Sequence, residues 1–219
     1  SRGASVIVVL TGAPGAGKGT QADLIADKLG FKKISTGDAL RRQIQLGSEI
    51  GKKAQSIMAE GRLVPDDVLL GILKSELDAT GNKPVLLDGY PRNLAQAKAL
   101  QEIVGKDGLK AAIHLDVDYQ CLTDRITGRR TCGQCGATYH IHNSPSRVEG
   151  VCDKCGGVLM QRPDDEAGKV TTRLKIYEND TRPILDYYRD LGLYHRVDGN
   201  SPTPKVFAEL SSLLQSLGA

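Results

Sequence analysis

The sequence predicts an α/β fold in which a mostly parallel sheet is flanked by helices. Short apolar, β-branched runs of strand length recur along the chain, and each precedes a polar or glycine-rich turn and a segment with helical spacing. The 219 residues, 40% hydrophobic and 25% charged, are enough to bury an ordinary core. One main domain with insertions fits this length better than two full domains.

The first strand is predicted at Val6-Ile7-Val8-Val9-Leu10, a continuous apolar run typical of a strand that is buried on both faces. A helix follows it, because Ala22, Ile25 and Leu29 recur at helical spacing. Gly30 ends that helix.

Three later runs repeat the pattern, at residues 84–87, 111–115 and 194–197. Helices are expected from about Leu94 and from about Tyr119. A last helix has its apolar face at Val206, Leu210, Leu213, Leu214 and Leu217.

Two segments interrupt the alternation and are predicted insertions into a core formed by residues 1–34, 66–127 and 166–219. Residues 35–64 contain two short helical patterns with no strand between them, and residues 128–165 have only scattered apolar residues. A long helix resumes near Ala167, and Pro183 is expected either to kink it or to begin a new segment. Its apolar face is formed by Leu174, Tyr177, Thr181, Ile184, Leu185 and Tyr188.

The charge of the chain argues against nucleic acid or an anionic membrane as its main partner. The 29 basic and 26 acidic residues give a net charge of only +3. The longest apolar run, residues 6–10, is far shorter than the roughly 20 residues of a membrane-spanning helix, and it lacks the organisation of a signal peptide. We therefore expect a cytoplasmic protein with neither nucleic acid nor membrane as a partner.

Residues 12–20 carry the strongest motif, the G-x-x-x-x-G-K pattern between the first strand and the first helix. Glycines let backbone N–H groups turn inward, the helix start adds positive potential, and Lys18 reaches terminal phosphates. The alternative is a tight turn with an exposed lysine. Gly19 stands where most such loops have Ser or Thr, so Thr20 is the candidate for a hydroxyl that contacts Mg²⁺.

The chain resembles the adenylate kinases at this motif and at four later ones. These are Ser35-Thr36-Gly37-Asp38-x-x-Arg41, Leu63-Val64-Pro65-Asp66, Asp88-Gly89-Tyr90-Pro91-Arg92-x-x-x-Gln96 and Arg125-x-x-x-Arg129. The resemblance implies a P-loop nucleoside triphosphate hydrolase-like core, a helical monophosphate-binding insertion at 35–64 and a lid at 128–165. It also implies transfer from Mg-ATP to AMP, giving two ADP, by a monomer.

Asp88, Arg92 and Gln96 follow a predicted strand. Asp88 either orients Mg²⁺-bound water or caps the turn. Arg92 offers a fork for phosphate, and Gln96, one helical turn later, offers an amide to a base edge. The resemblance assigns Gly89, Arg92 and Gln96 to AMP.

In the first insertion, Thr36 and Arg41 are either a helix start with a solvated arginine or ligands of a nucleotide. The resemblance implies that Thr36 contacts adenine and Arg41 the phosphate of AMP. It places Arg62, Leu63 and Val64 along the base and ribose.

Seven cations are candidates for binding the phosphates and the loose transition state of phosphoryl transfer. Arg125 and Arg129, four residues apart on a predicted helix, are expected to leave the same face. The seven are Lys18, Arg41, Arg92, Arg125, Arg129, Arg162 and Arg173, and the last two are also candidate AMP contacts. No general base is needed, because a phosphate monoester has a second pKa of about 6.

The resemblance also implies which residues border ATP. Thr138, Tyr139 and Arg129 lie on the lid side, and Ser201 lies in a loop near the adenine. The expected ATP-binding set is completed by Gly15, Ala16, Gly17, Lys18, Gly19 and Thr20.

The sequence predicts a structural zinc site at Cys132, Cys135, Cys152 and Cys155, two C-x-x-C pairs sixteen residues apart. Iron is a possible substitute, and two disulfides or redox pairs are the alternatives. Four sulfur ligands leave no open position for water, so the ion would hold a core-poor lid rigid. Cys121 is expected to be a packed free thiol.

Two other functions remain open at this point. The nearest is a related kinase that uses GTP as donor or another nucleoside monophosphate as acceptor. The other is a regulatory ATPase with a nucleic-acid-binding zinc ribbon, which the near-neutral charge and the 4% aromatic content disfavour.

Overall fold

A computed structural model describes residues 6–218, so residues 1–5 and 219 at the ends of the predicted core lie outside the described part. The chain divides into two compact units. Unit 1 contains residues 6–12, 17–116 and 180–218, and unit 2 contains residues 13–16 and 117–179.

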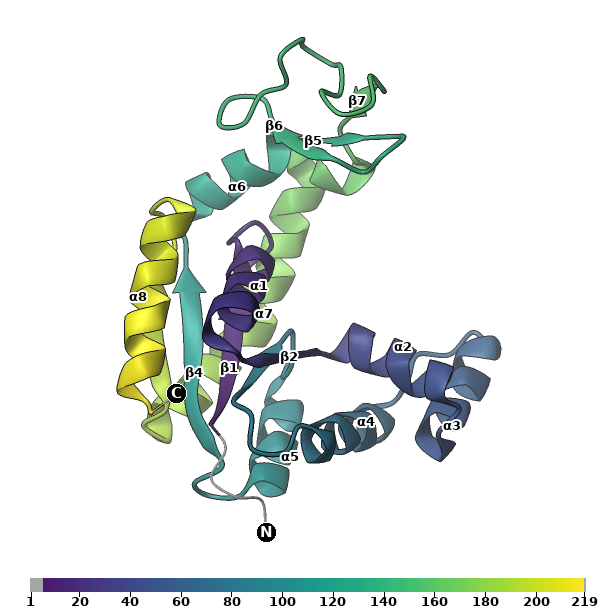
Figure 1. The fold of residues 1–219 in the computed structure, drawn as a ribbon, viewed down its shortest axis with the longest axis vertical. Coiled ribbons are helices and arrows are strands. Elements are labelled where there is room, and N and C mark those ends of the chain that lie inside the picture. Colours follow the sequence, from purple (N-terminus) through teal and green to yellow (C-terminus); the bar gives the residue numbers. More distant parts are fainter. Residues whose placement is uncertain (1–5, 219) are drawn as a thin grey trace. The chain divides into compact units, whose positions relative to one another are not determined.

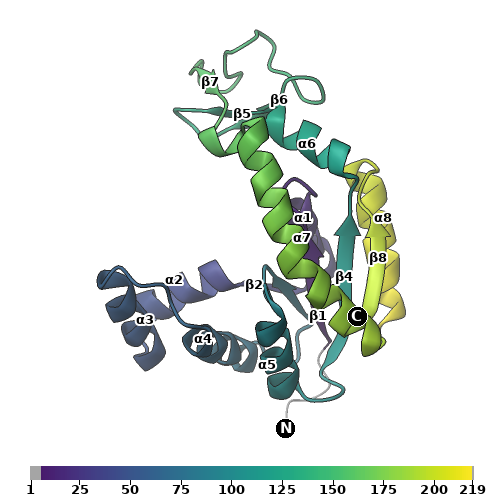
Figure 2. The same ribbon diagram turned by 180° about the vertical axis from the view of Figure 1, so that it is seen from behind.

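Unit 1 is built on a five-stranded parallel sheet, which confirms the α/β class. The strand order is β2-β3-β1-β4-β8, and Figure 2 shows the neighbours β4 and β8 side by side. The strands are β1 (Ile7–Gly12), β2 (Lys32–Ser35), β3 (Val85–Asp88), β4 (Leu109–Asp116) and β8 (Tyr194–Asp198). All five run in one direction, so their carboxyl ends share one edge of the sheet.

Helices cover both faces of this sheet (Figure 1). Ile7 and Val9 belong to a buried cluster with side chains of α4, α5 and the last turns of α7, while α1 and α8 contact each other. The helices are α1 (Lys18–Leu29), α4 (Asp66–Ala79), α5 (Leu94–Val104), α7 (Ala167–Asp190) and α8 (Thr203–Ser216). A continuous core of this kind makes the sheet edge a rigid base for a site.

The segment after β2 forms the two helices that the sequence predicts, α2 (Thr36–Leu46) and α3 (Glu49–Ala59). Ser35 caps α2 by accepting from the N–H of Asp38, and Ser48 caps α3 by accepting from the N–H of Gly51. Strand β2 and helix α4 are not anticipated by the sequence analysis.

Unit 2 contains α6 (Tyr119–Thr127), the first half of α7 (residues 167–179) and a three-stranded antiparallel sheet of order β6-β5-β7. The strands are β5 (Arg129–Cys132), β6 (Thr138–His140) and β7 (Leu159–Met160), and a short 3₁₀ turn, η1, spans Pro163–Asp165. The prediction that Arg125 and Arg129 share a helix face is wrong. Helix α6 ends at Thr127, Gly128 caps it, and Arg129 already lies in β5.

Pro183 lies inside α7, which continues without a break from Ala167 to Asp190, so the expectation of a new segment there is wrong. The predicted apolar face is confirmed, since Leu174, Ile184 and Tyr188 are buried. Within residues 6–218, no helix combines the length and the hydrophobicity needed to cross a membrane.

Candidate active site and metal centre

The glycine turn leaves the start of α1 open. Gly15 and Gly17 adopt φ angles of +85° and +86°, a region that side chains other than glycine rarely occupy. Gly17 gives α1 no side-chain cap, so the first N–H groups of the helix remain available to an external acceptor. Such a helix start attracts phosphate oxygens.

Lys18, Asp88 and Arg92 come together in unit 1 next to this helix start. The Lys18 ammonium donates to the carboxylate of Asp88, whose side chain is 12% exposed. Arg92 donates through Nε to the carbonyl of Gly89, 3.0 Å away. A Cβ placed on Gly89 would lie 3.8 Å from Nη2 of Arg92 and 4.0 Å from Nζ of Lys18, so both cations face this glycine.

Thr20 lies on the exposed surface of the first turn of α1, where a hydroxyl is accessible to a bound ion. Ser201 lies in the loop before α8 and is half-buried. Gly19 is exposed beside Thr20, and a Cβ there would meet open space.

Gln96 is buried on α5 and its amide is engaged at both ends. Its Oε1 accepts from the backbone N–H of Arg92 at 2.8 Å, and its Nε2 donates to Asp66 at 2.8 Å. Nearby, burial raises the pKa of Tyr90 to about 12, and the charge of Asp66 adds to the shift. The Tyr90 hydroxyl therefore remains a neutral donor at physiological pH.

Thr36 is the first residue of α2, and Arg41 lies on the exposed side of that helix. Arg41 pairs with Asp38, one turn earlier. In the loop between α3 and α4, Arg62 pairs with Glu60 at 2.6 Å and Leu63 is 93% exposed. A leucine as exposed as this offers an apolar contact to a ligand.

In unit 2, Arg125 reaches residues of the glycine turn. Its Nη1 donates to the carbonyls of Gly15 at 3.3 Å and Ala16 at 3.4 Å. Thr138 is exposed on β6, and Arg162 is exposed just before η1.

Asp165 joins two of the predicted arginines and was missed by the sequence analysis. Its side chain is 1% exposed, and Arg129 binds it in a fork, with Nη2 to Oδ1 at 2.6 Å and Nε to Oδ2 at 3.0 Å. Arg173 lies 3.6 Å from the same carboxylate. The hydrogen bond from Arg129, helped by the charges of Arg129, Arg173 and Arg162, lowers the pKa of Asp165. The acid pair that directly follows Arg162-Pro163 is the signal that points to it.

Replacing Asp165 with asparagine is expected to reduce the free energy of unfolding by about 2 kcal/mol at pH 7, because two guanidinium groups lose their buried charge partner. The lowered pKa fixes the pH dependence. The stabilisation is complete above the unfolded-state pKa of about 3.9 and is lost as the pH falls through the lower folded-state pKa. Urea unfolding of the parent and the variant from pH 7 to pH 3 should give a difference that is constant above about pH 5 and shrinks below pH 4.

Asp164→Asn is the matched control, because this neighbouring carboxylate is exposed. The control should unfold like the parent at every pH. A difference between parent and Asp165→Asn that persists unchanged at pH 3 would contradict the assigned ion pairs.

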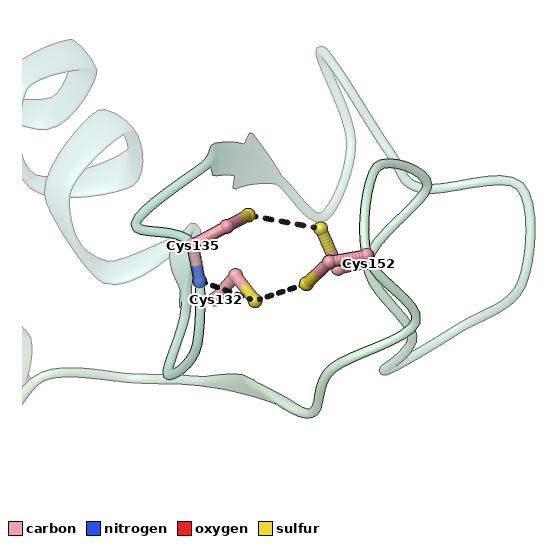
Figure 3. Close-up of side chains that lie close together, drawn as sticks. Cys132, Cys135 and Cys152 are labelled. Carbon is pink, nitrogen blue, oxygen red and sulfur yellow. Dashed lines mark hydrogen bonds between the residues drawn. The ribbon is translucent and has the colours of Figure 1, made fainter.

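The four predicted cysteines form one cluster, in which all sulfur atoms lie within 4.8 Å of one another. Cys132 and Cys155 are 3.4 Å apart at sulfur, and Cys135 and Cys152 are 3.6 Å apart. Figure 3 shows the labelled cysteines pointing their sulfur atoms toward one another from two loops. A disulfide bond needs about 2.05 Å, so these are thiols. Tetrahedral Zn²⁺ with sulfur ligands at about 2.3 Å needs sulfurs about 3.8 Å apart, and the cluster fits that spacing.

Hydrogen bonds favour the charged form of two of these thiols. The Tyr139 hydroxyl lies 3.3 Å from the sulfur of Cys152, and this bond lowers the pKa of that thiol to about 6. The backbone N–H of Cys135 lowers the pKa of Cys132. Tyr139 in turn accepts from the N–H of Asp153 at 2.9 Å. The hydrogen bond with Cys132 helps to raise the pKa of the fourth thiol, Cys155, to about 12, so the four groups share their charge unequally. The spacing of the four sulfurs is therefore what suits the cluster to a metal ion.

Comparisons with known proteins agree with the motifs. The family model described as adenylate kinase matches residues 10–193. An adenylate kinase of Caldanaerobacter subterraneus subsp. tengcongensis is 47% identical over 210 residues, covering 94% of this chain and 95% of that one. An adenylate kinase of Thermodesulfovibrio yellowstonii is 44% identical over 211 residues, covering 95% and 98%. One from Archaeoglobus fulgidus is 44% identical over 213 residues, covering 96% and 98%.

Proposed function

The chain belongs to the adenylate kinase family and is an ATP:AMP phosphotransferase, and we propose how its residues divide the reaction between them. The terminal phosphoryl group of Mg-ATP passes to the phosphate of AMP and gives two ADP. The acceptor is largely dianionic at neutral pH, because its second pKa is about 6, so no general base is required. The protein supplies position and positive charge.

Lys18 and the open start of α1 bind the terminal phosphates of ATP, together with the glycine turn. Asp88 faces the Mg²⁺ that accompanies ATP through bound water, and Thr20 offers a hydroxyl to the same ion. The observation that carries the proposal is that Lys18, Asp88 and Arg92 gather beside an uncapped helix start in unit 1. Cations beside such a helix start are suited to bind an anion such as a phosphate group.

AMP binds to the other residues of unit 1. Arg92 and Arg41 take its phosphate, and Thr36 and Gln96 contact its base. The exposed side chain of Leu63 packs along the base and ribose with Val64, and Arg62 lies beside them. Gly89 leaves space next to Arg92 for a phosphate oxygen.

The arginines of unit 2 stabilise the charge that spreads over the oxygens of the transferring group. These arginines are Arg125, Arg129, Arg162 and Arg173. Asp165 holds Arg129 and Arg173 ready, since a buried carboxylate keeps their guanidinium groups in fixed places. Thr138, Tyr139 and Ser201 border the adenosine of ATP.

The two insertions close over the nucleotides and exclude water, which would otherwise accept the phosphoryl group. Residues 35–64 close over AMP and residues 128–165 over ATP. The second insertion has few apolar residues with which to build a core. Cys132, Cys135, Cys152 and Cys155 would hold a structural zinc ion that keeps it rigid.

A coupled assay of diphosphate formation tests this function directly. ATP is supplied with AMP, GMP, CMP or UMP in turn, and GTP is then supplied with AMP. We expect the value of kcat/KM for ATP with AMP to exceed every other pair by at least about 100-fold, because buried polar groups left unpaired by the wrong base are costly. An equal rate with another monophosphate, or with GTP, would assign the chain a different substrate pair.

A further inference from the structure

The side-chain amide of Gln96 has its two ends held by different chemical groups, and this inference rests on the proposed contact of Gln96 with the base of AMP. The backbone N–H of Arg92 donates to Oε1, and Oδ1 of Asp66 accepts from Nε2, both at 2.8 Å. Gln96 is 6% exposed. All three residues lie in unit 1.

These partners allow only one orientation of the amide. A backbone N–H can only donate, so the atom that faces Arg92 must be the oxygen. An ionised carboxylate can only accept, so the atom that faces Asp66 must be the nitrogen. A flipped amide would set its NH₂ group against an N–H and its oxygen against a carboxylate. Gln96 is buried, so water gives its amide little compensation, although Asp66 itself is exposed.

The fixed orientation determines what Gln96 still offers to a ligand. An amide oxygen has a second lone pair and an NH₂ group has a second hydrogen, so one acceptor and one donor remain, in a fixed order. Adenine presents an amino donor at position 6 beside the acceptor N1, which matches a paired amide oxygen and N–H. A 6-oxopurine presents an acceptor at position 6 beside the donor N1–H, which is the reverse pattern and would need the flipped amide.

We propose that Asp66 is a specificity-determining positioning residue that locks the Gln96 amide in the orientation that accepts a 6-aminopurine monophosphate and rejects a 6-oxopurine monophosphate. Asp66 is the first residue of α4 and follows directly on the loop that carries Leu63 and Val64. We expect this residue to act on the base through its hydrogen bond to Gln96.

Inosine monophosphate is the probe, because it differs from AMP only in the oxygen at position 6 and the hydrogen on N1. The measurement is the ratio of kcat/KM for AMP to kcat/KM for inosine monophosphate, with saturating ATP. In Asp66→Ala this ratio is expected to fall by at least about tenfold, since the flipped amide no longer meets a carboxylate. The KM for ATP and the kcat with saturating AMP should stay within about twofold of the parent.

Asp66→Asn separates orientation from structure. It keeps the size of the side chain and a hydrogen bond to Gln96, but its amide donates as readily as it accepts, so only the N–H of Arg92 still selects an orientation. The ratio is expected to fall in this variant too, while its unfolding temperature stays close to that of the parent. Asp67→Ala is the matched control, because it removes the same charge from the same first turn of α4, and Asp67 is exposed as Asp66 is. Its ratio should not change.

Gln96→Ala distinguishes a failure of this inference from a failure of the proposed base contact. If Gln96→Ala lowers the ratio but both Asp66 variants stay within about threefold of the parent, the role of Asp66 is overturned and the base contact stands. If Gln96→Ala leaves the ratio and the KM for AMP unchanged, the base contact itself is wrong, and the role of Asp66 falls with it.

Discussion

Replacing Lys18 with alanine is expected to lower kcat roughly a thousandfold, corresponding to about 4 kcal/mol of lost transition-state stabilisation. The ammonium stands at the first residue of α1, where the open helix start and Arg92 add further positive potential. Steady-state assays with saturating ATP and AMP measure the loss.

We expect Lys18→Ala to lose activity and to keep its fold. Lys18 is an end residue of α1 and its side chain is 25% exposed, so alanine leaves no large cavity. Asp88 loses its ion-pair partner, which should cost only a modest part of the stability, because water can reach the carboxylate once the lysine is removed. Circular dichroism and the unfolding temperature check this point.

Lys28→Ala is the matched control for charge, because Lys28 lies in the last turn of the same helix and packs over Phe207. The control should keep kcat within about twofold of the parent. A loss of less than tenfold in Lys18→Ala would show that the glycine turn binds phosphate without help from this lysine.

The helices and strands that could be predicted from the sequence are those in which apolar residues follow a regular helical or strand spacing. The run from Val6 to Leu10 and the spacing of Ala22, Ile25 and Leu29 place β1 and α1, because a strand covered on both faces and a helix covered on one face have distinct periods. Strand β2 was missed, since Ile34 is the only fully buried residue among its four. A short edge strand of this kind has too few core contacts to leave a pattern.

Some residues of the candidate site also could not be predicted from the sequence, but for a different reason. Glycine, lysine and arginine could be found by their type and spacing, whereas Asp66 and Asp165 act by holding other side chains. Such roles depend on which residues the fold brings together across the chain. The prediction that one helix carries both Arg125 and Arg129 is wrong because Gly128, which lies between them, ends α6.

Replacing Cys132 with serine is the second change with a large expected effect. Serine is a poor ligand for a soft metal site, so the variant should lose the zinc ion that the four sulfurs are proposed to hold. Because the segment around it has little core of its own, metal loss becomes loss of folding free energy. We expect metal analysis to fall from about one zinc per chain to none, and the unfolding temperature to fall by roughly 10 °C.

Cys121→Ser gives the matched control, since Cys121 lies on α6, outside the four-sulfur cluster. It should keep the zinc and the unfolding temperature of the parent. If the ion is structural, Cys132→Ser should also retain phosphoryl transfer at low temperature, where the weakened segment is still folded, because four sulfur ligands leave the ion no open position for water or substrate. A variant that stays fully folded yet has no turnover at low temperature would instead give the ion a direct part in the chemistry. One that keeps its zinc would remove Cys132 from the ligand set.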